Sequence, residues 1–271
     1  MKTTERPTLR AEHRSLMDVE IITGIPLARI VATELRKMFD TRSGFWLMTS
    51  IVTFAVLASI AVVLFAPDHE LTYSSFIAAV GIPTTILLPV IAIVSVTDEW
   101  SQRSALVTFT LVPNRGLVLR AKSLASVITA LVSVPVVFGV AALGHVAGTS
   151  IAGVQSNWDL DAASLLTIGL ANLLALVLGF MVGLLVRRTA GAIVCYFVYT
   201  FVLPPLTMLL AGSQEWFYKA QPWIDYSYAQ AQLFDGSLTD QQWVHLGVTA
   251  LIWLAAPTVL GLRLVSRAEV K

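Results

Sequence analysis

Long apolar segments alternate with short polar ones along most of the chain. Six segments contain almost only apolar residues: 45–66, 73–96, 124–147, 165–186, 191–210 and 243–262. Each has about 20–24 residues, and a helix of that length crosses the roughly 30 Å hydrocarbon layer of a bilayer at about 1.5 Å per residue. The pattern predicts an all-α, polytopic membrane protein with six transmembrane helices.

The composition supports a membrane location. The chain is 56% hydrophobic and 13% charged, whereas a soluble domain typically has about 25% charged residues. Cys195 is the single cysteine, so the chain can form neither an internal disulfide nor a cysteine-based metal site. No metal or other cofactor is expected.

The basic residues predict the orientation of the spans. Of the 18 lysine and arginine residues, only Lys219 falls on the side opposite the others. The positive-inside rule places the crowded side in the cytoplasm, with both termini. We expect a cytoplasmic tail at 1–26, a transmembrane domain at 45–265, a tail at 266–271, and residence in a cell membrane, in particular a bacterial plasma membrane.

No acidic or basic side chain is expected within the six spans. Carriers that are driven by protons or ions usually bind the ion at a buried ionisable group. His145 and His245 are the nearest candidates, and an interfacial position is the simpler interpretation of both. Energy for any uphill transport is therefore expected from outside the chain.

Several residues within the spans predict departures from a plain helix. Pro83 and Pro89 in the second span, and Pro204 and Pro205 in the fifth, each remove a backbone hydrogen bond. These prolines could line a conduit or form a hinge, although proline is common in membrane helices. Asn172 should form a hydrogen bond between helices, an interpretation that we favour over substrate contact.

Residues 27–44 predict an amphipathic helix at the cytoplasmic interface. Apolar residues recur at steps of three and four: Leu27, Ile30, Val31, Leu35, Met38 and Phe39. Charged residues occupy the other positions: Arg29, Glu34, Arg36, Lys37 and Asp40. Such a helix lies along the membrane surface, in contact with lipids, with its charged side chains toward water.

The cytoplasmic loop 98–122 has the pattern of a docking site. Trp100, Ser104, Val107 and Leu111 share one face of a short helix that Pro113 ends. Asp98 and Glu99 are placed at the N-terminus of that helix, where anions are favoured. A second short helix is expected from Leu117. An exposed amphipathic helix beneath two spans suits a cytoplasmic partner.

The same loop contains a near match to a phosphate-binding loop. Gly116 is followed at the expected spacing by Ala121, Lys122 and Ser123. Alanine replaces the required second glycine, and the chain then enters the membrane instead of a soluble helix. We therefore expect no nucleotide to bind to this chain. No nucleic-acid partner is expected either.

The segment 212–242 is the long external loop, and it is rich in aromatic residues, among them Trp216, Trp223 and Tyr226. Aromatic side chains concentrate at membrane interfaces, so short helices that dip into the outer interface are expected. They could form an external gate, although interfacial anchoring is the simpler interpretation.

These elements, in this order, resemble the ABC-2 family of transporter permeases, the membrane subunits of type V ABC exporters. The resemblance covers the chain from about Leu27 onward. Glu34 and Lys37 match an acid and a base of the family's elbow helix. Further matches are Glu99, Pro113, Arg115 and Lys122 in the coupling loop, and Gly179, Gly183, Arg187 and Arg188 at the end of span four. The aromatic stretch matches a re-entrant element.

One motif departs from the family pattern. Arg103-Ser-Ala-Leu-Val stands where members often have Gly-Thr-Leu-Glu, so a second acid that could contact the ATPase is missing. Arg103 and Val107 are still included among the candidate coupling residues.

The resemblance implies a permease that pairs with a second permease subunit and with separate cytoplasmic ATPase subunits, which bind the ATP and Mg²⁺. Its cargo would be a hydrophobic or amphipathic drug, antibiotic, lipid or peptide. A non-transporting membrane subunit, for immunity, anchoring or assembly, is the alternative. An intramembrane enzyme is disfavoured because no paired carboxylates or histidine cluster occur at one depth.

Overall fold

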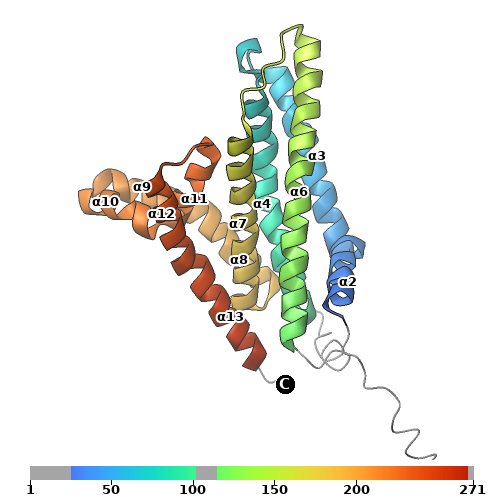
Figure 1. Ribbon diagram of the computed structural model, residues 1–271, viewed down its shortest axis with the longest axis vertical. Coiled ribbons are helices and arrows are strands. Elements are labelled where there is room, and N and C mark those ends of the chain that lie inside the picture. Colours follow the sequence, from blue (N-terminus) through green and yellow to red (C-terminus); the bar gives the residue numbers. More distant parts are fainter. Residues whose placement is uncertain (1–25, 102–114, 268–271) are drawn as a thin grey trace, which may run out of the picture.

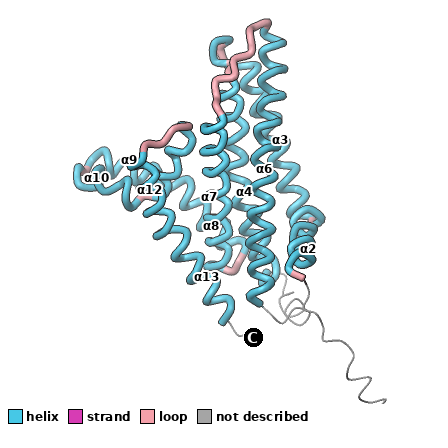
Figure 2. Tube along the Cα trace, in the orientation of Figure 1, coloured by secondary structure: helices cyan, strands magenta, loops and turns pink. Residues whose placement is uncertain are grey.

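The computed structural model describes residues 26–101 and 115–267. Every regular element in this part of the chain is a helix, and short connections join the helices (Figure 2). Six helices are long and apolar enough to cross a membrane. They extend over Gly44–Phe65, Tyr73–Asp98, Gly116–Ala152, Ala162–Val186, Thr189–Ser213 and Asp240–Leu264. The predicted all-α membrane architecture with six spans is confirmed.

The first half of the molecule is a tall bundle (Figure 1). It consists of α2 (Leu27–Asp40), α3 (Arg42–Phe65), α4 (Tyr73–Ser101), α6 (Arg115–Ala152) and α7 (Ala162–Val186). A single-turn helix, η1 (Asp68–Glu70), joins α3 to α4. We call these elements the N-terminal bundle.

The remaining elements form a shorter group beside it. Two spans are built from several pieces: α8 (Thr189–Phe197), η2 (Val198–Val202) and α9 (Leu203–Ser213), and later α12 (Asp240–Ala250), η4 (Leu251–Ala255) and α13 (Ala256–Arg267). Between them lie α10 (Glu215–Ile224), α11 (Tyr226–Ala231) and η3 (Gln232–Asp235). We call this the C-terminal group. In Figure 1, α9 and α10 lie to the side of the tall helices, well below their upper ends.

The helix α4 is the centre of the N-terminal bundle because it packs against α3, α6, α7 and α8. Glycines allow its closest approach to α7. A Cβ atom added at Gly179 would lie 2.4 Å from the Pro89 carbonyl oxygen, and one at Gly183 would lie 3.3 Å from Val96. A small-residue face therefore joins these two helices, as GxxxG spacing permits.

Two helix boundaries differ from the prediction. The amphipathic helix expected over 27–44 ends at Asp40, because Thr41 is extended and caps the next helix by accepting a hydrogen bond from the Gly44 amide. The third span begins well before residue 124: α6 runs without a break from Arg115 for 38 residues, about 57 Å. The short helix predicted from Leu117 is thus the first part of α6.

Prolines accompany both interruptions in the C-terminal group. The π-helical segment η2 directly precedes Pro204 and Pro205 in α9, and η4 directly precedes Pro257 in α13. Proline lacks an N–H and its ring clashes with the preceding turn, which favours such a local change of helix geometry, although α4 contains Pro83 and Pro89 without an interruption. The predicted interruption of the fifth span is confirmed.

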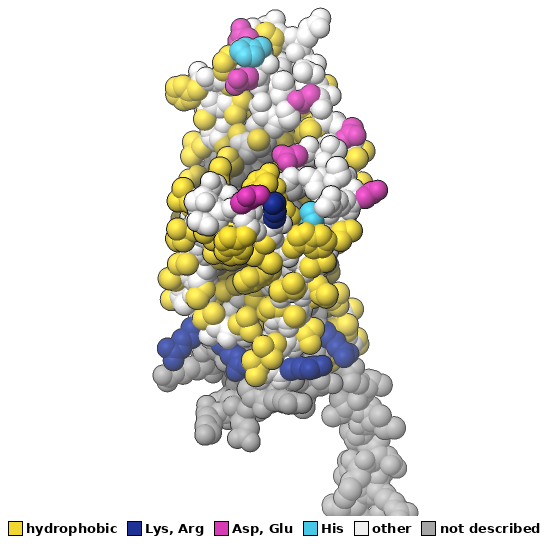
Figure 3. Space-filling view, turned by 90° about the vertical axis from the view of Figure 1, so that its left-hand side faces the viewer, with side chains coloured by type: hydrophobic (Ala, Val, Ile, Leu, Met, Phe, Trp, Pro, Cys, Tyr) yellow, Lys and Arg dark blue, Asp and Glu magenta, His cyan; other side chains and the backbone are white. Residues whose placement is uncertain are grey.

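Charged residues separate along the long axis of the molecule. On the face shown in Figure 3, most lysine and arginine side chains gather at one end, and the aspartate and glutamate side chains lie nearer the other. We call the first the basic end; α6 begins there, and α7 and α13 end there. The opposite, acidic end includes η1, with Asp68 and Glu70, and Asp159, which accepts a hydrogen bond from the Ser74 amide at the start of α4.

Candidate functional site

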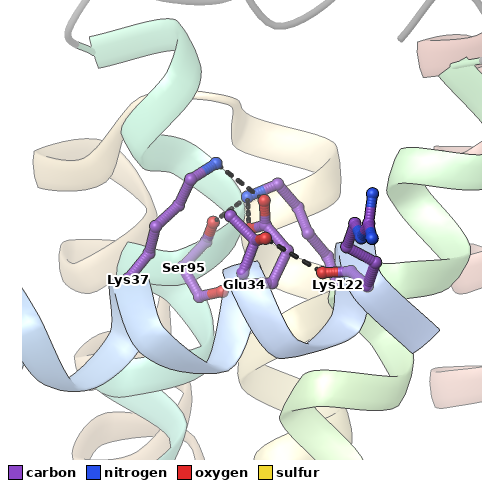
Figure 4. A network of polar contacts seen from close by, with 6 residues as sticks. Glu34, Lys37, Ser95 and Lys122 are labelled. Atoms are coloured by element: carbon purple, nitrogen blue, oxygen red, sulfur yellow. Dashed lines mark hydrogen bonds and ion pairs between the residues drawn. The ribbon is translucent and has the colours of Figure 1, made fainter. Parts of the chain in front are cut away.

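The basic end contains a buried ion pair between residues 88 positions apart. Lys122 Nζ in α6 lies 2.7 Å from Glu34 Oε2 in α2, and the two residues are 2% and 3% exposed. Lys122 Nζ also donates a hydrogen bond of 2.9 Å to the Ser95 carbonyl of α4. One ammonium group thereby joins three helices (Figure 4).

A second lysine completes the neutralisation of Glu34. Lys37 Nζ lies 2.7 Å from Glu34 Oε1, so each carboxylate oxygen has its own lysine. Burial would raise the pKa of Glu34, but the charge and hydrogen bond of Lys122, with those of Lys37, lower it overall. The carboxylate is therefore held in its charged form.

Helical spacing explains why Glu34 is inside. Ile30, Glu34 and Met38 are four residues apart, so they share one face of α2, and all three are buried. The expectation that Glu34 lies on the charged outer face was wrong. An acid can occupy an apolar helix face where a partner on another helix neutralises it.

A cavity of about 220 Å³ adjoins the ion pair. Besides Glu34, Lys37 and Lys122, its lining includes Ser95 and Asp98, which lie toward the end of α4. Glu34 and Lys37 of the predicted amphipathic helix thus meet Lys122 of the predicted cytoplasmic loop at one site. Sequence spacing gave no sign that Lys122 faces Glu34.

The structure describes only some of the other residues that were predicted to form the coupling loop. Arg103, Val107 and Pro113 lie outside the described residues, as does the predicted docking helix. Glu99 and Trp100 belong to the last turn of α4, so Asp98 and Glu99 do not begin a new helix as predicted. Arg115 is the first residue of α6. Only the backbone of Glu99, Trp100 and Arg115 is described.

The segment that resembles a phosphate-binding loop is helical. Gly116 to Ser123 belong to α6, Ala121 is fully buried, and Lys122 is paired with Glu34. A phosphate cradle needs a loop whose backbone N–H groups converge on the anion. In a helix these groups bond along the axis instead.

Two apolar cavities flank the exposed side of α4. One, of about 770 Å³, lies against α3 and includes Pro83 and Leu57 in its lining. The other, of about 600 Å³, lies against α7 and includes Ser74 and Thr85. Ile82 and Ile86 line both, and Ile82 is 64% exposed between them. The residues that line these cavities are uncharged. We call the pair the α4 groove.

A polar node lies beside this groove. Thr85 donates a hydrogen bond of 3.2 Å to Asn172 Oδ1, which joins α4 to α7 as predicted for Asn172. The Tyr196 hydroxyl donates to the Thr85 carbonyl at 3.2 Å. Pro89, four residues later, has no N–H to bond this carbonyl. Tyr196 of α8 therefore satisfies an acceptor that Pro89 leaves open, an arrangement that sequence reasoning missed.

The predicted external-gate residues have different environments. Trp216 and Trp223 are 63% and 42% exposed on α10, and the ring of Trp223 packs 4.4 Å from His245. Tyr226, in α11, is 1% exposed and belongs to the core of the C-terminal group. The three residues thus do not form one surface.

His145, expected near the outer interface, is fully buried inside the protein. Its ring is surrounded by those of Tyr73, Phe76 and Trp158, with centroids at 6.1, 5.7 and 4.9 Å. Gly144 and Gly148 bring this part of α6 close to α3 and α4. The single-sequence pattern could not show that these rings close around the imidazole.

Comparison with known proteins adds no family to these observations. No protein-family model matches the chain, and no curated protein matches it significantly.

Proposed function

We propose that the chain is the membrane-spanning permease subunit of an ATP-driven exporter that resembles the ABC-2 permeases. Its basic end would face the cytoplasm, in agreement with the positive-inside rule. A separate cytoplasmic ATPase would supply the energy, and a second permease subunit would complete the pathway. The cargo would be hydrophobic or amphipathic.

The observation that carries the proposal is the ion pair between Glu34 and Lys122. Lys122 lies in the first turns of α6, which directly follow the loop proposed to receive the ATPase. Because Lys122 binds both α2 and the α4 backbone, movement of that loop would be passed to three helices together. The site thus suits the transmission of force from a partner.

The α4 groove supports the class of cargo. Its lining is apolar apart from hydroxyl groups such as those of Ser74 and Thr85. An uncharged groove of this kind suits amphipathic compounds and offers no site for a driving proton or ion. The exposed ridge at Ile82 is also where a second permease subunit would enclose the pathway.

Purification of the tagged chain from its native membrane tests the proposal. We expect a soluble polypeptide with a P-loop to co-purify, and the complex to hydrolyse ATP. In proteoliposomes the complex should move a fluorescent hydrophobic dye when ATP is supplied. A preparation without such a polypeptide, together with unchanged dye accumulation in a deletion strain, would instead identify a non-transporting subunit.

The role of the ion pair is tested with both charges removed together. Replacing a buried pair on both sides is often tolerated by the fold, so Glu34→Gln/Lys122→Met should stay folded. We expect ATP-dependent dye transport to fall at least tenfold while the ATPase remains bound. Arg120→Met, which changes an exposed residue two positions away, is the control. Equal transport by the two variants would refute the coupling role.

A further inference from the structure

A second buried carboxylate lies in the C-terminal group, far along the chain from Glu34. Asp225, between α10 and α11, is 6% exposed. Its Oδ1 accepts a hydrogen bond from the Tyr228 amide at 3.2 Å, and its Oδ2 accepts one from Gln221 Nε2 at 3.1 Å. Within residues 26–101 and 115–267, no lysine, arginine or histidine forms an ion pair with it. The groups that donate hydrogen bonds to its carboxylate are therefore both neutral.

A cavity of about 190 Å³ adjoins this carboxylate. Four elements each contribute one aromatic residue to its walls: Tyr199 from η2, Phe217 from α10, Tyr226 from α11 and Trp253 from η4. Both π-helical segments thus contribute a ring to the same space. Such segments are often found at functional sites, because they turn side chains away from the regular helical register.

Two hydroxyl groups of the cavity residues are unsatisfied. The hydroxyl oxygens of Tyr199 and Tyr226 are buried, and neither has a hydrogen-bond partner in the described part of the chain. Burial raises the pKa of Tyr226, so that its hydroxyl stays neutral. A native structure rarely leaves two buried hydroxyls and an unpaired carboxylate around one cavity unless something else occupies it.

The cavity has a rim that can admit a ligand. Trp253 and Ile224 are 43% and 44% exposed, and Trp253 Nε1 donates a hydrogen bond of 2.7 Å to the Ile224 carbonyl. Because these two residues are both lining and exposed, they connect the interior to the outside of the molecule.

The chemistry of the lining selects among cations. Ca²⁺ and Mg²⁺ require about six or more oxygen ligands, whereas the side chains that line the cavity offer one carboxylate, two phenolic hydroxyls and the hydroxyl of Thr207. Aromatic faces attract organic cations, as in the cages that bind quaternary ammonium groups. We propose that this cavity binds a small organic ammonium ion, with Asp225 as the counter-charge and the rings of Tyr199, Tyr226 and Trp253 as its walls. The site lies outside the α4 groove and does not depend on the transport function.

Tetramethylammonium chloride is the probe that tests this site. The purified chain is titrated in maltoside detergent by calorimetry, because phosphatidylcholine headgroups would compete. We expect saturable binding that sodium chloride at the same ionic strength does not reproduce. The uncharged isostere tert-butanol should not bind. Tryptophan fluorescence should change over the same concentration range, since Trp253 lines the cavity.

Asp225→Asn is the decisive variant. Asparagine caps a helix as well as aspartate does, so α11 should be retained while the charge is lost. We expect affinity for tetramethylammonium to fall at least tenfold. Asp235→Asn, at a nearby exposed acid, should bind like the unaltered chain. Circular dichroism and melting temperature verify that both variants are folded.

Three results would overturn the proposal. The first is the absence of saturable tetramethylammonium binding to the unaltered chain. The second is equal affinity of Asp225→Asn and Asp235→Asn for this ion. The third is a calorimetric response to sodium chloride equal to that to tetramethylammonium chloride. None of these measurements requires an ATPase or a transport assay.

Discussion

Glu34 and Asp225 are both buried carboxylates, but the two halves of the molecule treat their charge differently. In the N-terminal bundle, two lysines lie within 2.7 Å of Glu34 and complete an internal ion pair. In the C-terminal group, Asp225 has an amide donor, a side-chain amide and an adjoining cavity. A cavity adjoins each carboxylate, but the two lysines already neutralise Glu34, whereas the charge of Asp225 is left for a ligand to neutralise.

The packing of the two halves differs in the same sense. The spans α7 and α4 are the most enclosed: 67% and 56% of their most apolar part is buried, against 6% in the Thr189–Ser213 span and 22% in the Asp240–Leu264 span. The outer spans of the N-terminal bundle are less enclosed, with 11% in Gly44–Phe65 and 22% in Gly116–Ala152. Glycine contacts join α4 to α7, whereas the C-terminal group has π-helical interruptions. The comparison therefore predicts that substitutions cost more stability at the contact between α4 and α7 than in the C-terminal group.

The largest effect is expected for Lys122→Met. This change leaves Glu34 buried with one lysine, itself partly exposed, and removes the bond to the Ser95 carbonyl. Breaking a buried pair on one side typically costs about 3–5 kcal/mol. Thermal or denaturant unfolding in detergent measures this loss. The double variant Glu34→Gln/Lys122→Met should recover much of it, and a double variant as unstable as the single one would contradict the pairing.

The next largest effect is expected for Gly179→Ala. Its new Cβ atom would meet the Pro89 carbonyl oxygen at 2.4 Å, so α7 and α4 must separate. Overpacking of this kind typically costs about 1–3 kcal/mol. Gly247→Ala is the matched control in the C-terminal group, because its Cβ would meet nothing within 4 Å. We expect that variant to be neutral or slightly stabilised in the same unfolding assay.

The six spans and the charge asymmetry could be predicted because they depend on local composition. The burial of Glu34 could not, since the acid is compatible with the apolar face of α2 only through Lys122, 88 positions later.

Asp225 illustrates a second limit of sequence reasoning. It lies in the segment 212–242 that was predicted as an external loop, yet it is buried at the junction of α10 and α11. One signal was present: an aspartate directly before Tyr226 can cap a helix, as it does by accepting from the Tyr228 amide. The aromatic residues that enclose it come from three separate stretches of the chain, which no local pattern connects.

A pH effect of intermediate size is expected from Glu34. The folded-state pKa of Glu34 is lowered from 4.5. Its contribution is therefore fully present above about pH 4.5 and is lost as the pH falls through the lowered value. Melting temperatures measured across this range should fall less steeply in Glu34→Gln than in the unaltered chain. Parallel curves for the two proteins would show that the ion pair does not contribute.

The smallest effect on stability is expected for Asp225→Asn. Without an internal cation to lose, the substitution removes an unpaired charge while the helix cap is kept. The free energy of unfolding should change by less than about 1 kcal/mol and could increase. Unfolding in detergent without added ammonium salt is the measurement. A loss of unfolding free energy as large as that expected for Lys122→Met would mean that Asp225 also forms a charge pair that stabilises the fold.

The unbroken length of α6 has a mechanical consequence. Lys122 lies near one end of this helix and His145 toward the other, with Pro135 between them. An α-helix resists bending where its hydrogen-bond ladder is complete, and proline interrupts that ladder. The stiffness of α6 is therefore lowest near its midpoint. A displacement at the basic end would therefore reach the aromatic residues around His145 chiefly as a bend of α6 at Pro135.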